Sequence, residues 1–211
     1  MARLKQGILG PVSGSVGTIV GSSWRDIDYI RSKLTKPKGD PSPLQLDNQH
    51  KFSAVMNFVS TMTELVNQTF DKYAVNISPS NAAFSYNFDN AITGTSPDYS
   101  IDYAKALVSR GDLPNASGVA ATVTNKTLHF TWTDNSGLGM AQATDEAVLV
   151  AYCKNYNLTL YSIGAAVRSA KAGVLDVSNF NGFTVETWIA FLNEDGSMAS
   201  NSIYTGELMV S

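Results

Sequence analysis

The chain has 211 residues, of which 44% are hydrophobic and 16% charged, so it can bury a core and is not an intrinsically disordered chain. Its single cysteine, Cys153, excludes an intrachain disulfide and with it a disulfide-stapled secreted scaffold. The net charge of −3 is uneven, because residues 1–38 carry a net +5, which leaves −8 for the remainder. A basic segment on an acidic body predicts contact with nucleic acid, anionic lipid or the acidic face of a neighbouring copy; the alternative is a solvated basic end.

The first element is a glycine-rich stretch, GILGPVSGSVGTIVGSSW, over residues 7–24. Glycine and serine interrupt it too often for a membrane-spanning helix or for the apolar region of a signal peptide, and its five glycines disfavour a soluble helix. Strand periodicity fits better and places Val12, Val16, Val20 and Trp24 on one face. We therefore predict an extended arm or a hairpin with tight glycine turns, in which glycine lets another backbone approach closely.

The arm carries too few large side chains to form a core of its own, so we expect it to pack against a partner. The predicted partner-binding residues are Val12, Val16, Val20, Trp24, Arg25, Tyr29 and Arg31. Aromatic and basic residues in this mixture could also stack on bases and contact phosphate. Asp26 and Asp28 would oppose a phosphate backbone, which favours aromatic anchoring to protein.

A linker and a helical segment follow. Three prolines and a glycine in KLTKPKGDPSPLQ predict the linker, and apolar residues at helical spacing predict one amphipathic helix over about residues 44–73. A shorter helix is expected in SPSNAAFSYNFDNAITG, capped by Ser80 or Asn81 and closed by Gly94. DYSIDYAKALVSRG, residues 98–111, alternates and predicts a strand.

From about residue 115 the pattern changes to short strands separated by turn sequences such as NEDG. The predicted strands lie in TLHFTWT, DEAVLVAYCKN, NLTLYSI, GVLDVSN, FTVETWIAFLNE and SIYTGELMV. Six or seven strands in about 100 residues are typical of a β-sandwich. Trp132, Tyr152 and Trp188 are expected to fill the space between its two sheets. With no cysteine pair, a fibronectin type III-like domain fits better than a disulfide-bearing immunoglobulin domain.

The predicted fold class is therefore α+β. A glycine-rich basic arm occupies residues 1–38, and a helical segment with a linker and a strand occupies residues 39–114. A fibronectin type III or immunoglobulin-like sandwich occupies residues 115–211.

Several motifs resemble one family along nearly the whole chain. They are MARLKQGILG, SGSVGTIVGSSW, DYIRS, LVSRGDLP and the C-terminal TWTDN…SNSIYTGELMV. The chain resembles a domain-of-unknown-function family of Bacteroidota genomes and their associated phages, whose members open with this stretch and end in a fibronectin-like half. The resemblance implies lineage and architecture but no activity. The linker of relatives is more basic than residues 39–45 here, which weakens a nucleic-acid interpretation of the linker.

No arrangement of histidine or cysteine predicts a metal or catalytic site. His50 and His129 have no partner at metal-ligand spacing. His129 is expected to face outward from a strand, and Cys153 to be a small buried apolar residue.

The acidic and glycine-rich motifs do not indicate catalysis either. Asp145 and Glu146 point to opposite faces if they lie on a strand, while Glu194 and Asp195 belong to the turn NEDG. GSVGTIVG lacks the GK[ST] of a phosphate loop. We expect no catalytic residue, no cofactor and no metal, and hence a protein that is not an enzyme.

The leading expectation is a non-enzymatic structural component of a phage or phage-like particle, attached or self-assembled through the arm. One alternative is a cell-surface or particle-borne module that binds glycan or protein through DNSGLGMAQATDE and NEDGSMASNS. The other is a nucleic-acid-associated protein that uses the basic arm. The expected location is the virion or, since no signal peptide is recognised, the bacterial cytoplasm; no membrane span is expected.

Overall fold

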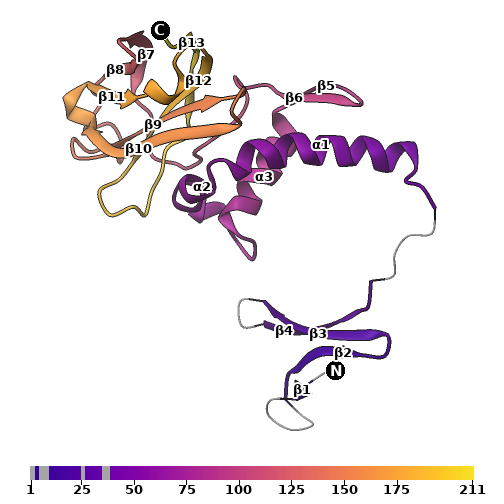
Figure 1. The fold of residues 1–211 in the computed structure, drawn as a ribbon. Coiled ribbons are helices and arrows are strands. Elements are labelled where there is room, and N and C mark those ends of the chain that lie inside the picture. The colour runs from indigo at the N-terminus through magenta and orange to yellow at the C-terminus, as the bar shows by residue number, and fades with distance from the viewer. Residues whose placement is uncertain (1–2, 5–9, 25–26, 35–38) are drawn as a thin grey trace. The chain divides into compact units, whose positions relative to one another are not determined.

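The computed structural model describes residues 3–4, 10–24, 27–34 and 39–211 (Figure 1). The chain divides into two compact units, Met1–Ser42 and Pro43–Ser211. The division lies within the predicted linker, of which residues 35–38 are outside the described residues.

The N-terminal unit is a small antiparallel sheet with strand order β1-β2-β3-β4. Its strands are β1 (Arg3–Leu4), β2 (Val12–Val16), β3 (Ile19–Trp24) and β4 (Ile27–Ser32). Val16 pairs with Ile19, so Gly17 and Thr18 make a two-residue turn. Gly17 has φ +56°, as a type II′ hairpin turn requires at its first central position. The predicted hairpin with a tight glycine turn is confirmed.

Gly21 shows why glycine recurs in this sheet. A Cβ at this position would lie 1.9 Å from the carbonyl oxygen of Val12, so the two backbones approach more closely than any side chain allows. The expectation that glycine permits close backbone approach is confirmed at this position.

The two-residue turn changes which residues share a face. Residues paired across antiparallel strands project to the same side, so Val16 lies with Ile19, whereas Val20 and Trp24 project to the other side. The prediction of one face containing Val12, Val16, Val20 and Trp24 is therefore wrong. That prediction continued a single strand through positions where the chain reverses.

The body begins with helices α1 (Pro43–Ser60), α2 (Thr63–Thr69) and α3 (Pro79–Asn90). The single helix predicted over residues 44–73 is thus divided. Thr61 Oγ1 donates to the carbonyl oxygen of Phe58 (2.7 Å) and bonds Thr159 Oγ1 (2.6 Å), and Met62 N donates to Val59 O (3.2 Å). The two bonds back into the helix tighten its last turn, and the bond to Thr159 on β10 (Leu158–Val167) holds the chain where α1 ends. Among the helices so described, none is long and apolar enough to cross a membrane.

Helix α3 begins and ends differently from the prediction. Ser78 is its N-cap and accepts from the backbone N–H of Asn81 at 3.2 Å, with Pro79 in the first turn. The helix ends at Asn90, and Gly94 lies instead in a hairpin of β5 (Ile92–Thr95) and β6 (Asp98–Ile101). The strand predicted over residues 98–111 therefore stops at residue 101, beyond which backbone groups bond to α2 and to the sandwich.

Residues 117–209 form a β-sandwich, as predicted. Its strands are β7 (Ser117–Thr124), β8 (Thr127–Thr133), β9 (Glu146–Cys153), β10 (Leu158–Val167), β11 (Ala172–Asp176), β12 (Thr184–Leu192) and β13 (Ile203–Met209). One sheet has the order β10-β9-β12-β13 and the other β11-β8-β7. The six predicted strands correspond to β8–β13, and β7 is added at the edge of the smaller sheet.

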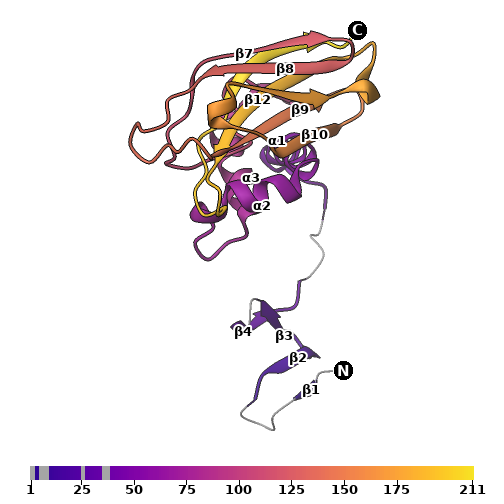
Figure 2. The same cartoon turned by 90° about the vertical axis from the view of Figure 1, so that its left-hand side faces the viewer.

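The body has three layers, because the helices cover the outer face of the four-stranded sheet (Figure 2). Trp132 fills the space between the sheets as expected and meets Phe191 edge-on at 5.6 Å. Tyr152 and Trp188 do not; they point to the helical layer, where Phe58 of α1 contacts both rings. β9 and β12 are consequently buried on both faces.

Candidate partner-binding surfaces

The N-terminal sheet has almost no interior. Of residues 10–24, 27–34 and 39–42, Gly21 alone is buried. Larger apolar side chains are exposed, among them Val16 (52%), Ile27 (63%) and Ile30 (60%). A sheet of this size needs a covered apolar face for stability, so these side chains form a candidate surface for contact with a partner.

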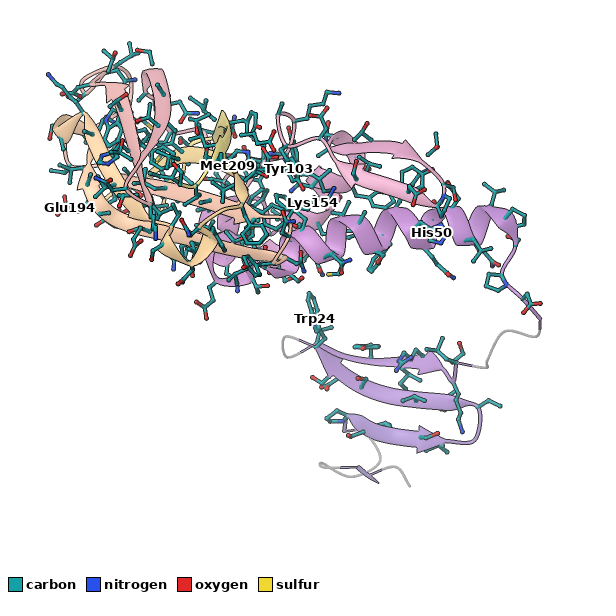
Figure 3. The ribbon with its side chains drawn as sticks, turned by 45° about the horizontal axis from the view of Figure 1, so that its top comes forward. Trp24, His50, Tyr103, Lys154, Glu194 and Met209 are labelled. Carbon is teal, nitrogen blue, oxygen red and sulfur yellow. The ribbon has the colours of Figure 1, made fainter. Side chains whose placement is uncertain are left out.

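Both faces of the sheet carry large apolar side chains. Val16, Ile19 and Ile30 share one face through the pairs Val16–Ile19 and Gly21–Ile30. Val20, Trp24, Ile27, Tyr29 and Arg31 share the other. Figure 3 shows the Trp24 side chain projecting from the end of this sheet.

The predicted partner-binding residues are therefore divided. Val12 is half-buried and pairs with Leu4 of β1, whereas Tyr29 and Arg31 lie on β4 with exposed side chains. Arg25 lies outside the described residues. The sequence reasoning missed Ile19, Ile27 and Ile30, although the alternation in IDYIRS could have indicated a strand with apolar residues on both sides.

β4 is also an edge strand of the sheet. All six of its residues are exposed. An outer strand offers unpaired backbone N–H and C=O groups on its free side, which can pair with a strand of another chain.

A second surface lies at one end of the sandwich. The two loops predicted as ligand-binding, residues 134–146 and 193–202, together line a pocket of about 390 Å³. Asp145, Glu194 and Asp195 line it with Gln142, Thr144 and Asn193. The fold thus brings Asp145 together with Glu194 and Asp195, which the sequence analysis treated separately.

A buried ion pair fixes the first of these loops. Arg168 and Asp145 are both fully buried, with Nε and Oδ2 2.9 Å apart. The Arg168 guanidinium also donates to Asn135 Oδ1 (2.7 Å) and Pro114 O (2.9 Å), and Asp145 Oδ2 accepts from the N–H of Gln142 (2.9 Å). Nothing in the sequence pattern singled out Arg168.

The acidic residues of this pocket do not form a metal site. Asp195 accepts from the Ser197 N–H at 2.9 Å, and hydrogen bonds from Ser197 hold the pKa of Asp195 below its usual value. Among the residues that the structure describes, no group of three histidine, cysteine or acidic side chains is placed to hold a metal ion.

The three residues considered for chemistry are dispersed. His50 lies on α1 (Figure 3) and bonds Ser96 Oγ at 3.3 Å. His129 alternates with the buried Leu128 and Phe130 and so faces outward from β8, as predicted. Cys153 is fully buried, also as predicted.

Comparisons with known proteins give a family and similarities to solved structures. No curated protein matches the chain. Among solved structures, the FN1–FN3 domains of chicken CNTN1 are similar at 15% identity and a TM-score of 0.36; the match covers 49% of this chain and 36% of that one. The family model DUF6266, described as a family of unknown function, matches residues 11–206. The chain therefore belongs to the family DUF6266.

Proposed function

We propose that the protein is a non-enzymatic structural component of a phage or phage-like particle, which it enters through the N-terminal sheet. The observation that carries this proposal is the exposure of the N-terminal sheet. It forms a unit of its own with apolar side chains on both faces, and among its described residues one is buried. Such a sheet gains stability when a second surface covers it.

The partner is another particle protein or a further copy of this chain. The free side of β4 can add to the edge of a neighbouring sheet, while Val16, Ile19 and Ile30 or Trp24, Ile27 and Tyr29 are covered. Arg31 reaches acidic groups of the partner. The sandwich, whose seven strands in sheets of three and four support a fibronectin type III-like assignment, is displayed outward.

Removal of residues 1–38 tests this function. The truncated chain should stay folded but no longer sediment with particles isolated from the producing bacterium, whereas the full chain does. Ile30→Ser should reduce incorporation, while Val75→Ser, at an exposed position of the body, should not. Normal incorporation of the truncated chain, or failure of the full chain to sediment with particles, would contradict the proposal.

A second candidate function is a binding module for glycan or protein, favoured by the pocket between residues 134–146 and 193–202. Planar polar side chains such as Asn193 and Asp195 suit the hydroxyl groups of a sugar. A glycan array probed with the full chain and with the Asp195→Asn variant measures sugar binding and its dependence on this loop. Absent signals, or equal signals for both chains, would count against the loops as the binding site.

A further inference from the structure

The motif LVSRGDLP, residues 107–114, lies in the segment between β6 and β7 and is held firmly in place. Its backbone bonds to α2 and to the loop between β12 and β13. The bonds are Val108 N to Ser202 Oγ (3.0 Å), Arg110 N to Thr69 O (3.2 Å) and Gly111 N to Asn201 Oδ1 (3.2 Å). The position of the Arg110 backbone is therefore fixed from both sides.

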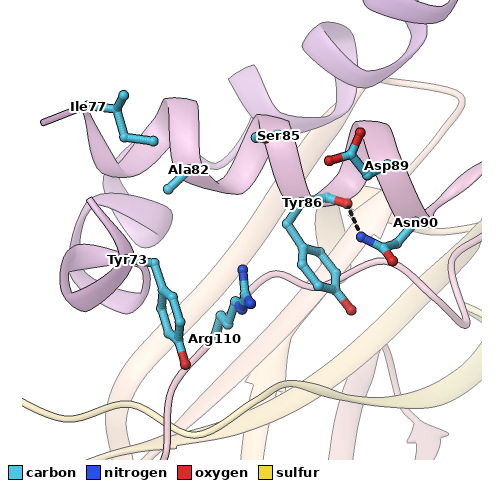
Figure 4. Close-up of a pocket in the computed structure, with 8 residues that line it drawn as sticks. All are labelled: Tyr73, Ile77, Ala82, Ser85, Tyr86, Asp89, Asn90 and Arg110. Carbon is cyan, nitrogen blue, oxygen red and sulfur yellow. Dashed lines mark hydrogen bonds between the residues drawn. The ribbon is translucent and has the colours of Figure 1, made fainter. Parts of the chain in front are cut away.

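The Arg110 side chain is fixed as well, because it lies between two aromatic rings (Figure 4). The guanidinium carbon is 4.1 Å from the ring centroid of Tyr73 and 4.9 Å from that of Tyr86. Contact with aromatic rings favours the cation and orients its plane. The N–H groups along the edge of that plane keep their capacity to donate.

The chain itself does not use these donors. Within the described residues, the Arg110 guanidinium makes no hydrogen bond or ion pair with a side chain or carbonyl oxygen. The nearby Asp112 is bound by Lys72 and by Tyr73 Oη, and the bond from Lys72 is the main reason that its pKa is lowered. A half-buried cation held by aromatic rings, with unused donors, is suited to bind an anion.

Arg110 opens into a pocket of about 440 Å³. Ile77 and Ala82 supply apolar lining, and Ser85 and Asn90 supply polar lining. Asp89 also lines the pocket and lies beyond Tyr86 along α3 (Figure 4). One cation with an acidic residue nearby fits a singly charged group better than a doubly charged one.

We propose that this pocket binds a carboxylate group through Arg110. The planar guanidinium edge matches the two oxygens of a carboxylate, and the apolar lining accommodates the carbon atoms that carry it. The carboxylate can belong to an acidic amino acid or to a uronic acid. This inference is independent of the proposed role of the N-terminal sheet, which lies in the other unit.

Titration of the full chain followed by NMR of the Arg110 Nε–H signal tests the site. The probes are N-acetylglutamate, glucuronate and inorganic phosphate at constant ionic strength. A saturable shift with either carboxylate, at a lower Kd than for phosphate, supports the site, and the tighter of the two identifies the source. Phosphate binding as tight as that of the carboxylates, or no saturable shift, overturns the proposal.

Variants distinguish specific binding of a carboxylate at Arg110 from a general attraction of anions to positive charge. Arg110→Lys keeps the charge but loses the planar pair of donors, so the Kd, followed through backbone amide signals, should rise about tenfold or more. Lys126→Gln removes one positive charge, as Arg110→Gln does, but from an exposed side chain in the turn between β7 and β8, and should leave the Kd unchanged. An equal effect of Lys126→Gln and Arg110→Gln would overturn the proposal; the titration of the unaltered chain decides the matter if Arg110→Gln fails to fold.

Discussion

At the scale of single residues, Gly21 and Arg168 each have a structural role that depends on their residue type. Gly21 lies against the backbone of Val12, and the Arg168 guanidinium bonds Asp145, Asn135 and Pro114 at one end of the sandwich. The first was foreseen from the glycine spacing. The second was not, because an isolated arginine in a sequence gives no sign of being buried.

Gly21→Ala should disrupt the N-terminal sheet, because the added methyl group would meet the Val12 carbonyl oxygen at 1.9 Å. Hydrogen exchange should show lost protection in β2 and β3, with the body unchanged. Ser22→Ala, next to Gly21 on β3, is the matched control, since it adds no atom toward another backbone. Equal loss of protection in both variants would show that close approach is not the reason for Gly21.

Arg168→Met should lower the free energy of unfolding of the body by about 3–5 kcal/mol, because it leaves the Asp145 carboxylate buried without its partner. Asp145→Asn added to this variant should recover part of the loss. Urea denaturation measures both. Lys105→Met, which breaks an exposed ion pair with Asp102, should cost less than about 1 kcal/mol. If the changes in the free energy of unfolding caused by Arg168→Met and Asp145→Asn simply add in the double variant, the two side chains are not directly coupled.

At the scale of elements, the central strands β9 and β12 pack on both faces. Their side chains alternate between two buried clusters, one between the two sheets and one between the four-stranded sheet and the helices, which include α1. The sequences EAVLVAYC and TVETWIAFL predicted strands, but a nearly continuous apolar run does not tell which side chains face which layer. Tyr152 and Trp188 were placed in the wrong core for this reason.

Phe58→Ala should lower the free energy of unfolding by about 3–5 kcal/mol, because Phe58 is 1% exposed and contacts Tyr152 and Trp188. Phe52→Ala on the same helix should cost about 1 kcal/mol, since Phe52 is 49% exposed and contacts Phe84 at its surface. Urea midpoints with unchanged m-values would measure the difference. Similar losses for both would show that α1 does not stabilise the sheet through Phe58.

At the scale of the whole molecule, the two units differ in what stabilises them. The buried apolar clusters of the described chain begin at Val55, and none of residues 10–24 and 27–34 belongs to them. Met1–Ser42 carries seven basic and three acidic residues, whereas Pro43–Ser211 carries eight basic and 15 acidic residues. This arrangement suits a body that folds by itself and an arm that contacts something else.

Limited trypsin digestion should therefore cut within the lysine-containing residues 33–38 and release a stable body. Its urea midpoint should equal that of the body transition in the full chain, because neither buried cluster includes an arm residue among those described. Circular dichroism at 222 nm follows the helices and hence the body. A lower midpoint for the fragment would show that the arm stabilises its own body.

The sequence by itself determined the sandwich, the presence of helices before it and the glycine-rich hairpin, because strand alternation and glycine turn chemistry are local properties. Tertiary structure alone decided the break after Ser60, where Thr61 bonds Thr159 far along the chain. It alone also decided the two faces of the arm, since a two-residue turn reverses the phase of alternation. The pocket of Arg110 could not be predicted from the sequence, because its residues come from three segments. Tyr73 follows α2, Tyr86 lies on α3 and Arg110 follows β6, and they meet only when these segments pack together.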